Sequence, residues 1–162
     1  ALAMVDPLTG AASRRGFDAA AAGAMADVAR SGQPLSLLAL DLDRFKDIND
    51  RYGHPVGDRV LAATAHAWQA LLRERDLLAR IGGEEFVVVC PDTSLEKARG
   101  IAMRLLEATD ALRFDDIDPA LRVGVSIGLA QTEPDDTLAT LHSRADAALY
   151  HAKQDGRGRV EG

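Results

Sequence analysis

The sequence feature that most constrains the fold is the segment Gly-Gly-Glu-Glu-Phe at residues 82–86, which lies between two apolar runs. The runs, at residues 77–81 and 86–90, have the length and composition of β-strands. They predict a β-hairpin whose turn is Gly-Gly, where positive φ is permitted and another molecule can approach the backbone. Two adjacent carboxylates at a turn are unfavourable unless something positive lies beside them. The segment therefore predicts a hairpin and, at its turn, a bound cation.

The composition limits the classes of function that the chain can have. Its 162 residues suffice for one hydrophobic core, and the formal net charge of −6 argues against a broad nucleic-acid-binding face. The single cysteine, Cys90, is expected in the core, and the lack of a possible intrachain disulfide fits a reducing, cytoplasmic compartment. No apolar stretch is long enough to span a membrane, although a longer chain could be membrane-anchored. Residues 1–5 have the character of a cut piece of such a chain or of a cloning remnant.

Hydrophobic periodicity divides the chain into helices and strands. After a helix at residues 17–30, the order is strand, helix, strand, strand, helix, strand, helix. This is the ferredoxin-like β-α-β-β-α-β plan with extra terminal helices, so the expected fold class is α/β (α+β) around a central, mostly antiparallel sheet. The expected strands are residues 35–40, 77–81, 86–90 and 121–130, and the expected later helices are residues 44–52, 56–72, 94–112 and 137–155.

The topology predicts a cluster of carboxylates. In this plan the first and third strands are antiparallel neighbours, so Asp41 and Asp43, which follow the first strand, lie beside Glu84 and Glu85, which precede the third. A hard divalent cation such as Mg²⁺ relieves the repulsion in such a cluster and completes its shell with water and substrate phosphates. Asp41 and Glu84 are the expected ligands. The alternative is that these are ordinary solvated or helix-capping acids.

Other polar residues fit a nucleoside triphosphate. Lys46 follows Asp41 closely, and Lys153 and Arg157 lie four positions apart at the end of the last helix, where they could share a face and bind phosphate. The alternative for them is that they complement the helix dipole. Asn49 and Asp58 could recognise a guanine edge, or could instead be an Asx turn and a first-turn acid.

Several further segments carry a resemblance to a known family. They are residues 6–10 with Arg14-Arg15, and residues 41–50, 53–58, 125–128 and 146–157. With the segment at residues 82–86, they make nearly the whole chain similar to a GGDEF domain, the catalytic module of diguanylate cyclases. The resemblance implies a fold like the palm domains of nucleotidyl cyclases. It also implies one catalytic domain over residues 1–162, within a longer chain that has an N-terminal sensory or dimerisation region.

The resemblance implies an activity, in which two GTP molecules condense to cyclic di-GMP and two pyrophosphates. One chain offers one GTP site, so a homodimer is needed for catalysis. The resemblance also implies a role for each site residue. Asp41, Glu84 and the Leu42 carbonyl would bind Mg²⁺ or Mn²⁺, and Glu85 would assist the metal or the deprotonation of the 3′-hydroxyl. The phosphates would be bound by N–H groups near Phe45 and by Lys46, Lys153 and Arg157, guanine would be recognised by Asn49 and Asp58, and Gly83 would leave room for the nucleotide.

A second site is implied by Arg73 and Asp76, which match the family's R-x-x-D motif for feedback inhibition by cyclic di-GMP. Arg104 is a weaker candidate for a contact from a partner domain. The alternative for Arg73 and Asp76 is an ion pair between residues i and i+3 at a helix end. Two other functions stay open beside the enzyme: a non-catalytic receptor of cyclic di-GMP, and a GTP-binding regulatory domain.

Overall fold

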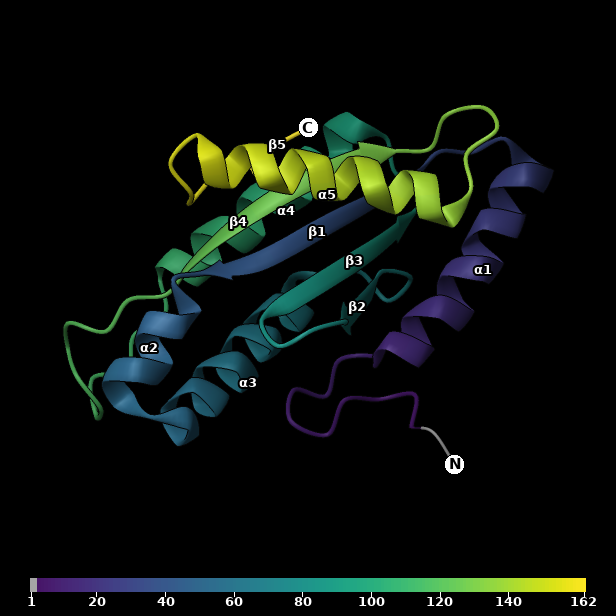
Figure 1. The fold of residues 1–162 in the computed structure, drawn as a ribbon. Helices are drawn as coiled ribbons and strands as arrows, with labels where there is room; N and C mark the ends of the chain where they lie inside the picture. The colour runs from purple at the N-terminus through teal and green to yellow at the C-terminus, as the bar shows by residue number, and fades with distance from the viewer. Residues whose placement is uncertain (1–2) are drawn as a thin grey trace.

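The computed structural model describes residues 3–162, which form a five-stranded sheet with helices packed on both faces (Figure 1). Ala1 and Leu2, from the opening stretch, lie outside the described residues. The helices are α1 (Arg14–Ser31), α2 (Phe45–Tyr52), α3 (His54–Leu71), α4 (Leu95–Asp110) and α5 (Leu138–Gln154). The strands are β1 (Leu35–Asp43), β2 (Leu77–Arg80), β3 (Glu85–Pro91), β4 (Gly124–Gln131) and β5 (Val160–Glu161).

The sheet has the strand order β2-β3-β1-β4-β5 and confirms the predicted, mostly antiparallel topology. β1 lies between β3 and β4 and is antiparallel to both, and β2 and β3 form the predicted hairpin. Only the short β5, which the sequence pattern did not predict, runs parallel to its neighbour β4 within the described part of the chain. Because β1 and β3 are antiparallel, the end of β1 and the start of β3 lie at the same edge of the sheet.

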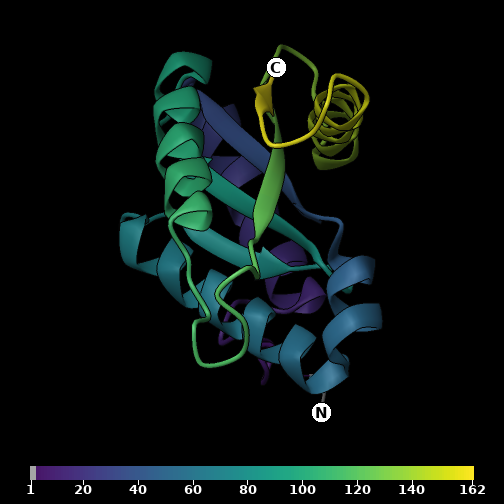
Figure 2. The same ribbon diagram turned by 90° about the vertical axis from the view of Figure 1, so that its left-hand side faces the viewer.

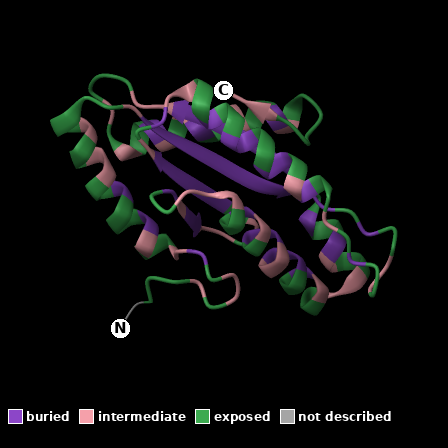
Figure 3. Cartoon of the chain, turned by 180° about the vertical axis from the view of Figure 1, so that it is seen from behind, coloured by how far each residue is buried: buried purple, intermediate pink, exposed green. Residues whose placement is uncertain are grey.

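Helices cover both faces of the sheet, which explains why β1 is buried along nearly all its length. Side chains of α2, α3 and α4 pack on one face, and side chains of α1 and α5 pack on the other. Figure 2 shows α4 and α5 on opposite sides of the strands, and Figure 3 shows that the central strands are mostly buried. With both faces covered, only the ends of the strands can present polar side chains to a ligand.

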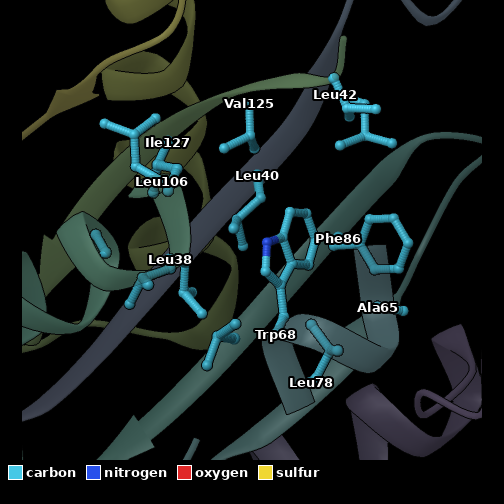
Figure 4. Close-up of a cluster of buried hydrophobic side chains, with 14 of the residues drawn as sticks. Leu38, Leu40, Leu42, Ala65, Trp68, Leu78, Phe86, Leu106, Val125 and Ile127 are labelled. Carbon is cyan, nitrogen blue, oxygen red and sulfur yellow. The ribbon is translucent and has the colours of Figure 1, made fainter. Parts of the chain in front are cut away.

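The larger core cluster is centred on Trp68 of α3 (Figure 4). The indole ring meets the ring of Phe86 edge-on, with centroids 5.1 Å apart, and its Nε1–H donates to Thr109 Oγ1 of α4 over 2.8 Å. Phe86 directly follows Glu85 at the start of β3. The acidic end of the hairpin is therefore fixed to the core by its neighbouring residue. Cys90 lies in the same cluster, where burial raises the pKa of its thiol to about 12.

Several element boundaries differ from the sequence-based expectation, among them the end of β1, which includes Asp41 and Asp43 instead of ending at residue 40. α2 and α3 are separated by a single residue, Gly53, whose φ of +90° favours glycine. β4 begins at Gly124 rather than at residue 121. Leu121 and Val123 are buried in the core, which accounts for their apolar side chains, but they lie outside the strand. α5 ends at Gln154, so the residues after it form a separate turn. In the described part of the chain, no helix has both the length and the apolar character that crossing a bilayer requires.

Candidate active site

Carboxylates from two strands meet at one edge of the sheet, as the topology predicts. Asp41 of β1 is directly opposite Glu85 of β3 in the strand register. The Leu42 N–H donates to the Glu84 carbonyl over 3.3 Å, so the hairpin loop lies against the end of β1. In a strand the carbonyl of a residue points to the same side as its N–H, so the Leu42 carbonyl also faces this loop. Residues more than forty positions apart are thus brought together.

The loop of the hairpin contains four residues rather than a two-residue turn. The N–H groups of Ile81 and Gly82 both donate to the Glu85 carbonyl, over 2.9 and 3.3 Å. Neither Gly82 nor Gly83 has a positive φ, so the expectation that this turn uses positive φ is wrong. A four-residue loop does not require the left-handed conformation that a two-residue hairpin turn does. Gly83 instead provides space, since a Cβ there would have nothing within 4 Å.

Asp41 is the most buried carboxylate of this cluster, with 8% of the residue exposed. Burial raises the pKa of Asp41, the Lys153 ammonium opposes this effect, and the neighbouring charges of Glu84 and Asp43 add to it. Lys153 reaches from α5 and places its Nζ 2.7 Å from Asp41 Oδ2. The cluster therefore needs positive charge, and the chain supplies one ammonium group.

The donor set fits Mg²⁺ or Mn²⁺ better than a metal that needs many protein ligands. Among the described residues, no group of three or more His, Cys, Asp or Glu side chains is arranged to hold a metal ion. The charge of Glu84 contributes to the raised pKa of Asp41, and the Leu42 carbonyl faces the same loop. Two carboxylates and a carbonyl suit a cation that keeps water and takes phosphate oxygens as its remaining ligands.

A pocket of about 410 Å³ opens beside the carboxylates, between α2, α3 and the hairpin loop. It contains six of the residues singled out from the sequence and four that were not. Its lining consists of Phe45, Lys46, Asn49, Asp50, His54, Asp58, Leu61, Arg80, Gly83 and Glu84. The pocket thus joins the expected phosphate-binding, guanine-binding and metal-binding residues in one concave site.

Two polar side chains in this pocket differ in their exposure. Asp58 is exposed, whereas the Oδ1 atom of Asn49 is buried without a hydrogen-bond partner. Gly57 makes this position possible, because a Cβ at residue 57 would lie 1.8 Å from Asn49 Oδ1. Lys46 is exposed and pairs with Asp50 over 2.8 Å, a hydrogen bond that raises the pKa of the lysine. Its ammonium group is at the surface of the pocket.

Lys153 and Arg157 do not share a helical face, and that expectation is wrong. Lys153 lies in the last turn of α5, but Arg157 lies beyond the end of the helix, with a φ of +64°. The glycines on both sides of Arg157 redirect the chain, so the i, i+4 geometry of a helix does not hold there. Neither residue lines the pocket. Lys153 reaches the acidic cluster through Asp41.

The residues of the second expected site form an ion pair with each other. Arg73 Nη2 lies 2.6 Å from Asp76 Oδ1, and Arg73 Nε donates to Asp76 Oδ2 over 2.9 Å. The Asp76 side chain is 1% exposed, and Thr93 Oγ1 also accepts from Arg73 over 2.6 Å. The pair precedes β2 and so lies at the opposite end of that strand from the hairpin loop. Arg104 is exposed on α4.

The sequence pattern did not reveal two contacts that support the acidic end of the sheet. Arg80 of β2 donates to the Gly83 carbonyl over 3.0 Å and pairs with Asp6 over 3.3 Å. Asp43 accepts hydrogen bonds from Ser126 and from the N–H of Gly158. Except for the Arg80–Gly83 hydrogen bond, the partners are more than seventy positions apart, and no local periodicity marks them. The first and last segments of the described chain thus both reach this end of the sheet.

Comparisons with known proteins agree on the family. The sequence profile described as "Diguanylate cyclase, GGDEF domain" matches residues 3–159. The chain is 42% identical over 159 residues to diguanylate cyclase DgcP of Pseudomonas aeruginosa, covering 98% of this chain and 24% of that protein. It is 39% identical over 161 residues to diguanylate cyclase VdcA of Vibrio cholerae, covering 98% and 46%.

A solved structure shows the same fold. The GGDEF domain of DgcB from Caulobacter crescentus, solved in complex with c-di-GMP, superposes with a TM-score of 0.94 at 30% identity, covering 99% of this chain and 96% of that chain. By contrast, the chain spans a quarter to a half of the length of the first curated relatives that it matches.

Proposed function

Because the chain belongs to the GGDEF family of diguanylate cyclases, we propose that it condenses two molecules of GTP into cyclic di-GMP and two pyrophosphates. The observation that carries this proposal is the register of β1 and β3, which places Asp41 opposite Glu85, next in the chain to Glu84 of the pocket lining. An inactive relative of the fold would not need a buried carboxylate with like charges beside it at this edge of the sheet.

In the proposed site, Asp41, Glu84 and the Leu42 carbonyl hold Mg²⁺ or Mn²⁺. The bound metal would neutralise charge on the α-phosphate and favour ionisation of the 3′-hydroxyl. Glu85 is exposed beside this group, where it would accept the proton of the 3′-hydroxyl or assist metal binding. The burial of Asp41 strengthens each of these electrostatic interactions.

The pocket would hold the rest of the nucleotide. Asn49 and Asp58 would recognise guanine, while Lys46 and the N–H groups near Phe45 at the start of α2 would bind the β- and γ-phosphates. Lys153 and Arg157 would add positive charge from the far side of the carboxylates. Gly83, with open space at its α-carbon, would let the nucleotide lie against the hairpin.

Catalysis would require two chains. The pocket described here has room for one nucleotide and is formed by α2, α3 and the hairpin loop of a single chain. Each 3′-oxygen would attack the α-phosphate held by the other chain, so a symmetric pair would complete the catalyst. The chain covers only part of its relatives, and a fused segment is the expected source of pairing.

The decisive experiment is chromatography of the products after incubation of the chain with GTP and Mg²⁺, with and without an added dimerisation domain. We expect cyclic di-GMP, and we expect Asp41→Ala or Glu85→Ala to abolish it. Glu107→Ala, an exposed acid on α4, serves as the matched control and should leave product formation unchanged. If a forcibly dimerised chain forms no cyclic di-GMP, the proposed activity is refuted.

We also propose that cyclic di-GMP binds near Arg73, Asp76 and Arg104 and inhibits the enzyme. The buried Arg73–Asp76 pair is unsuitable for a first test, because breaking it would leave a buried charge without its partner. Arg104 is exposed, so Arg104→Ala should retain the fold and weaken product binding. Calorimetry with GTP and with cyclic di-GMP separates the possible functions, since a pure receptor would bind only the second ligand.

A further inference from the structure

Asp43 has both of its carboxylate oxygens engaged, and none of its partners belongs to the site described above. Ser126 Oγ donates to Asp43 Oδ1 over 2.6 Å, and the Gly158 N–H donates to Asp43 Oδ2 over 3.0 Å. The same N–H lies 3.2 Å from Ser126 Oγ, so the three groups form a closed set of hydrogen bonds. Ser126 is fully buried. We refer to these three residues as the clamp.

The backbone around the clamp is shaped to allow these contacts. Gly124 lies opposite Asp43 in the β1–β4 register, and a Cβ at residue 124 would come within 3.2 Å of Asp43 Oδ2. Gly158 has a φ of +57°, which directs its N–H toward the sheet at little conformational cost. The clamp thus depends on glycine at residues 124 and 158.

The clamp contacts a turn whose backbone conformation is unusual, beside the turn's own hydrogen bonds from the Gly156 and Arg157 N–H groups to the end of α5. Gly156, Arg157 and Gly158 have φ values of +121°, +64° and +57° in succession. The left-handed conformation of Arg157 is unfavourable for a residue with a side chain, so its surroundings must enforce it. Asp43 and Ser126 both accept from the Gly158 N–H of the turn, and Arg159 Nε donates to the Arg157 carbonyl over 3.2 Å. The turn directly follows the helix that carries Lys153.

We propose that Asp43 is a positioning residue, which acts with Ser126 through the Gly158 N–H to aim Arg157 at the phosphates of the bound nucleotide. This inference rests on the proposed function, in which Arg157 binds phosphate. Asp43 contributes hydrogen-bond acceptors rather than a metal ligand, because both of its oxygens are already engaged. The resulting expectation is specific: for nucleotide binding, the acceptor geometry of Asp43 matters more than its negative charge.

Two variants of Asp43 separate geometry from charge. Asp43→Asn removes the charge, but its Oδ1 can still accept from Gly158 and its amide can donate to Ser126 Oγ. Asp43→Ala removes both contacts. Amide hydrogen exchange measured by NMR without nucleotide should show a protected Gly158 N–H in the wild-type chain and in Asp43→Asn. The same N–H should exchange at least about tenfold faster in Asp43→Ala and faster than wild type in Ser126→Ala.

Nucleotide binding then tests the functional part of the proposal. The probe is the α,β-methylene analogue of GTP with Mg²⁺, titrated by calorimetry into each variant. We expect Asp43→Ala to bind about tenfold more weakly and Asp43→Asn to stay within about twofold of the wild type. In an Arg157→Ala background, Asp43→Ala should cause less than about a twofold further loss, because the residue that it positions is already absent.

The possible outcomes divide clearly. If Asp43→Asn binds as weakly as Asp43→Ala, or if the losses from Asp43→Ala and Arg157→Ala multiply, the charge of Asp43 acts directly and the positioning role is wrong. Loss of Gly158 protection with unchanged nucleotide affinity would also overturn it, since the clamp would then be structural only. Ser126→Ala keeps the test valid if Asp43→Ala does not fold. If the wild-type chain binds no analogue, the proposed function itself fails. This result is distinct from a failure of the positioning role, which only the comparison of the variants tests.

Discussion

Asp41 forms an ion pair with a lysine. The Lys153 ammonium lies 2.7 Å from a carboxylate that is almost completely buried. A cation that binds Asp41 must compete with this ammonium group. The nucleotide phosphates that a metal brings would offer Lys153 an alternative partner, so metal and nucleotide are expected to bind together.

Replacing Lys153 by methionine should therefore have two opposite effects. Lys153→Met leaves the Asp41 carboxylate without its partner, and the free energy of unfolding without metal should fall by about 2 kcal/mol. The same variant should bind free Mn²⁺ more tightly than the wild type when no nucleotide is present. Urea denaturation and electron paramagnetic resonance of Mn²⁺ measure the two effects. Lys97→Met, an exposed lysine on α4, should change neither quantity.

At the scale of elements, α3 and α4 are linked by a single buried hydrogen bond from Trp68 to Thr109. Thr109→Val keeps the side-chain volume but leaves the indole N–H without an acceptor, which should lower the free energy of unfolding by about 1–3 kcal/mol. Thr64→Val is the control, because the Thr64 hydroxyl bonds only to the Val60 carbonyl of its own helix. Equal losses in the two variants, measured by urea denaturation, would contradict this interpretation.

The ion pair between Asp136, which precedes α5, and Arg144 of α5 should make the free energy of unfolding depend on pH. The Arg144 guanidinium holds the pKa of Asp136 well below its usual range, aided by hydrogen bonds from the Glu133 N–H and the Thr140 hydroxyl. Because the pKa is lower in the folded chain, the stabilisation is present above the unfolded pKa of about 4 and is lost as the pH falls through the folded value.

Asp136→Asn should accordingly lower the free energy of unfolding at pH 7 by about 2 kcal/mol and make it less sensitive to acid. Urea midpoints measured at pH 7, 4 and 3 check this expectation. Asp115→Asn, an exposed aspartate, should retain the acid sensitivity of the wild type. If Asp136→Asn loses stability below pH 4 as steeply as the wild type does, another group is responsible.

Most elements could be predicted from the sequence because their apolar periodicity reflects burial. The hairpin, the strand order and the meeting of Asp41 with Glu85 followed from that pattern. β5 could not be predicted, since two residues carry no period and its pairing depends on β4. The expectation that Arg157 shares a helical face with Lys153 was wrong, because it assumed that α5 continues past its last residue, Gln154. The clamp at Asp43 joins segments that only the folded chain brings together.

At the scale of the whole molecule, the proposed activity depends on how often two chains meet. At concentrations where pairs are scarce, the rate of product formation per chain should rise about tenfold for a tenfold increase in concentration. Fusion to a constitutive dimer should remove this dependence. Initial rates over a dilution series measure it. A rate per chain that stays constant on dilution in an unfused monomer would contradict the need for a pair.

The exposure of the hairpin loop has a consequence for side reactions. Gly83 and Glu85 are both exposed to solvent among residues 3–162. Water could then reach an α-phosphate made reactive by the site, because the part of the hairpin loop at Gly83 and Glu85 is not covered by any element of residues 3–162. The second chain would therefore do more than deliver a hydroxyl group. It would also protect GTP from wasteful hydrolysis, and a chain without a partner should waste any nucleotide that it manages to activate.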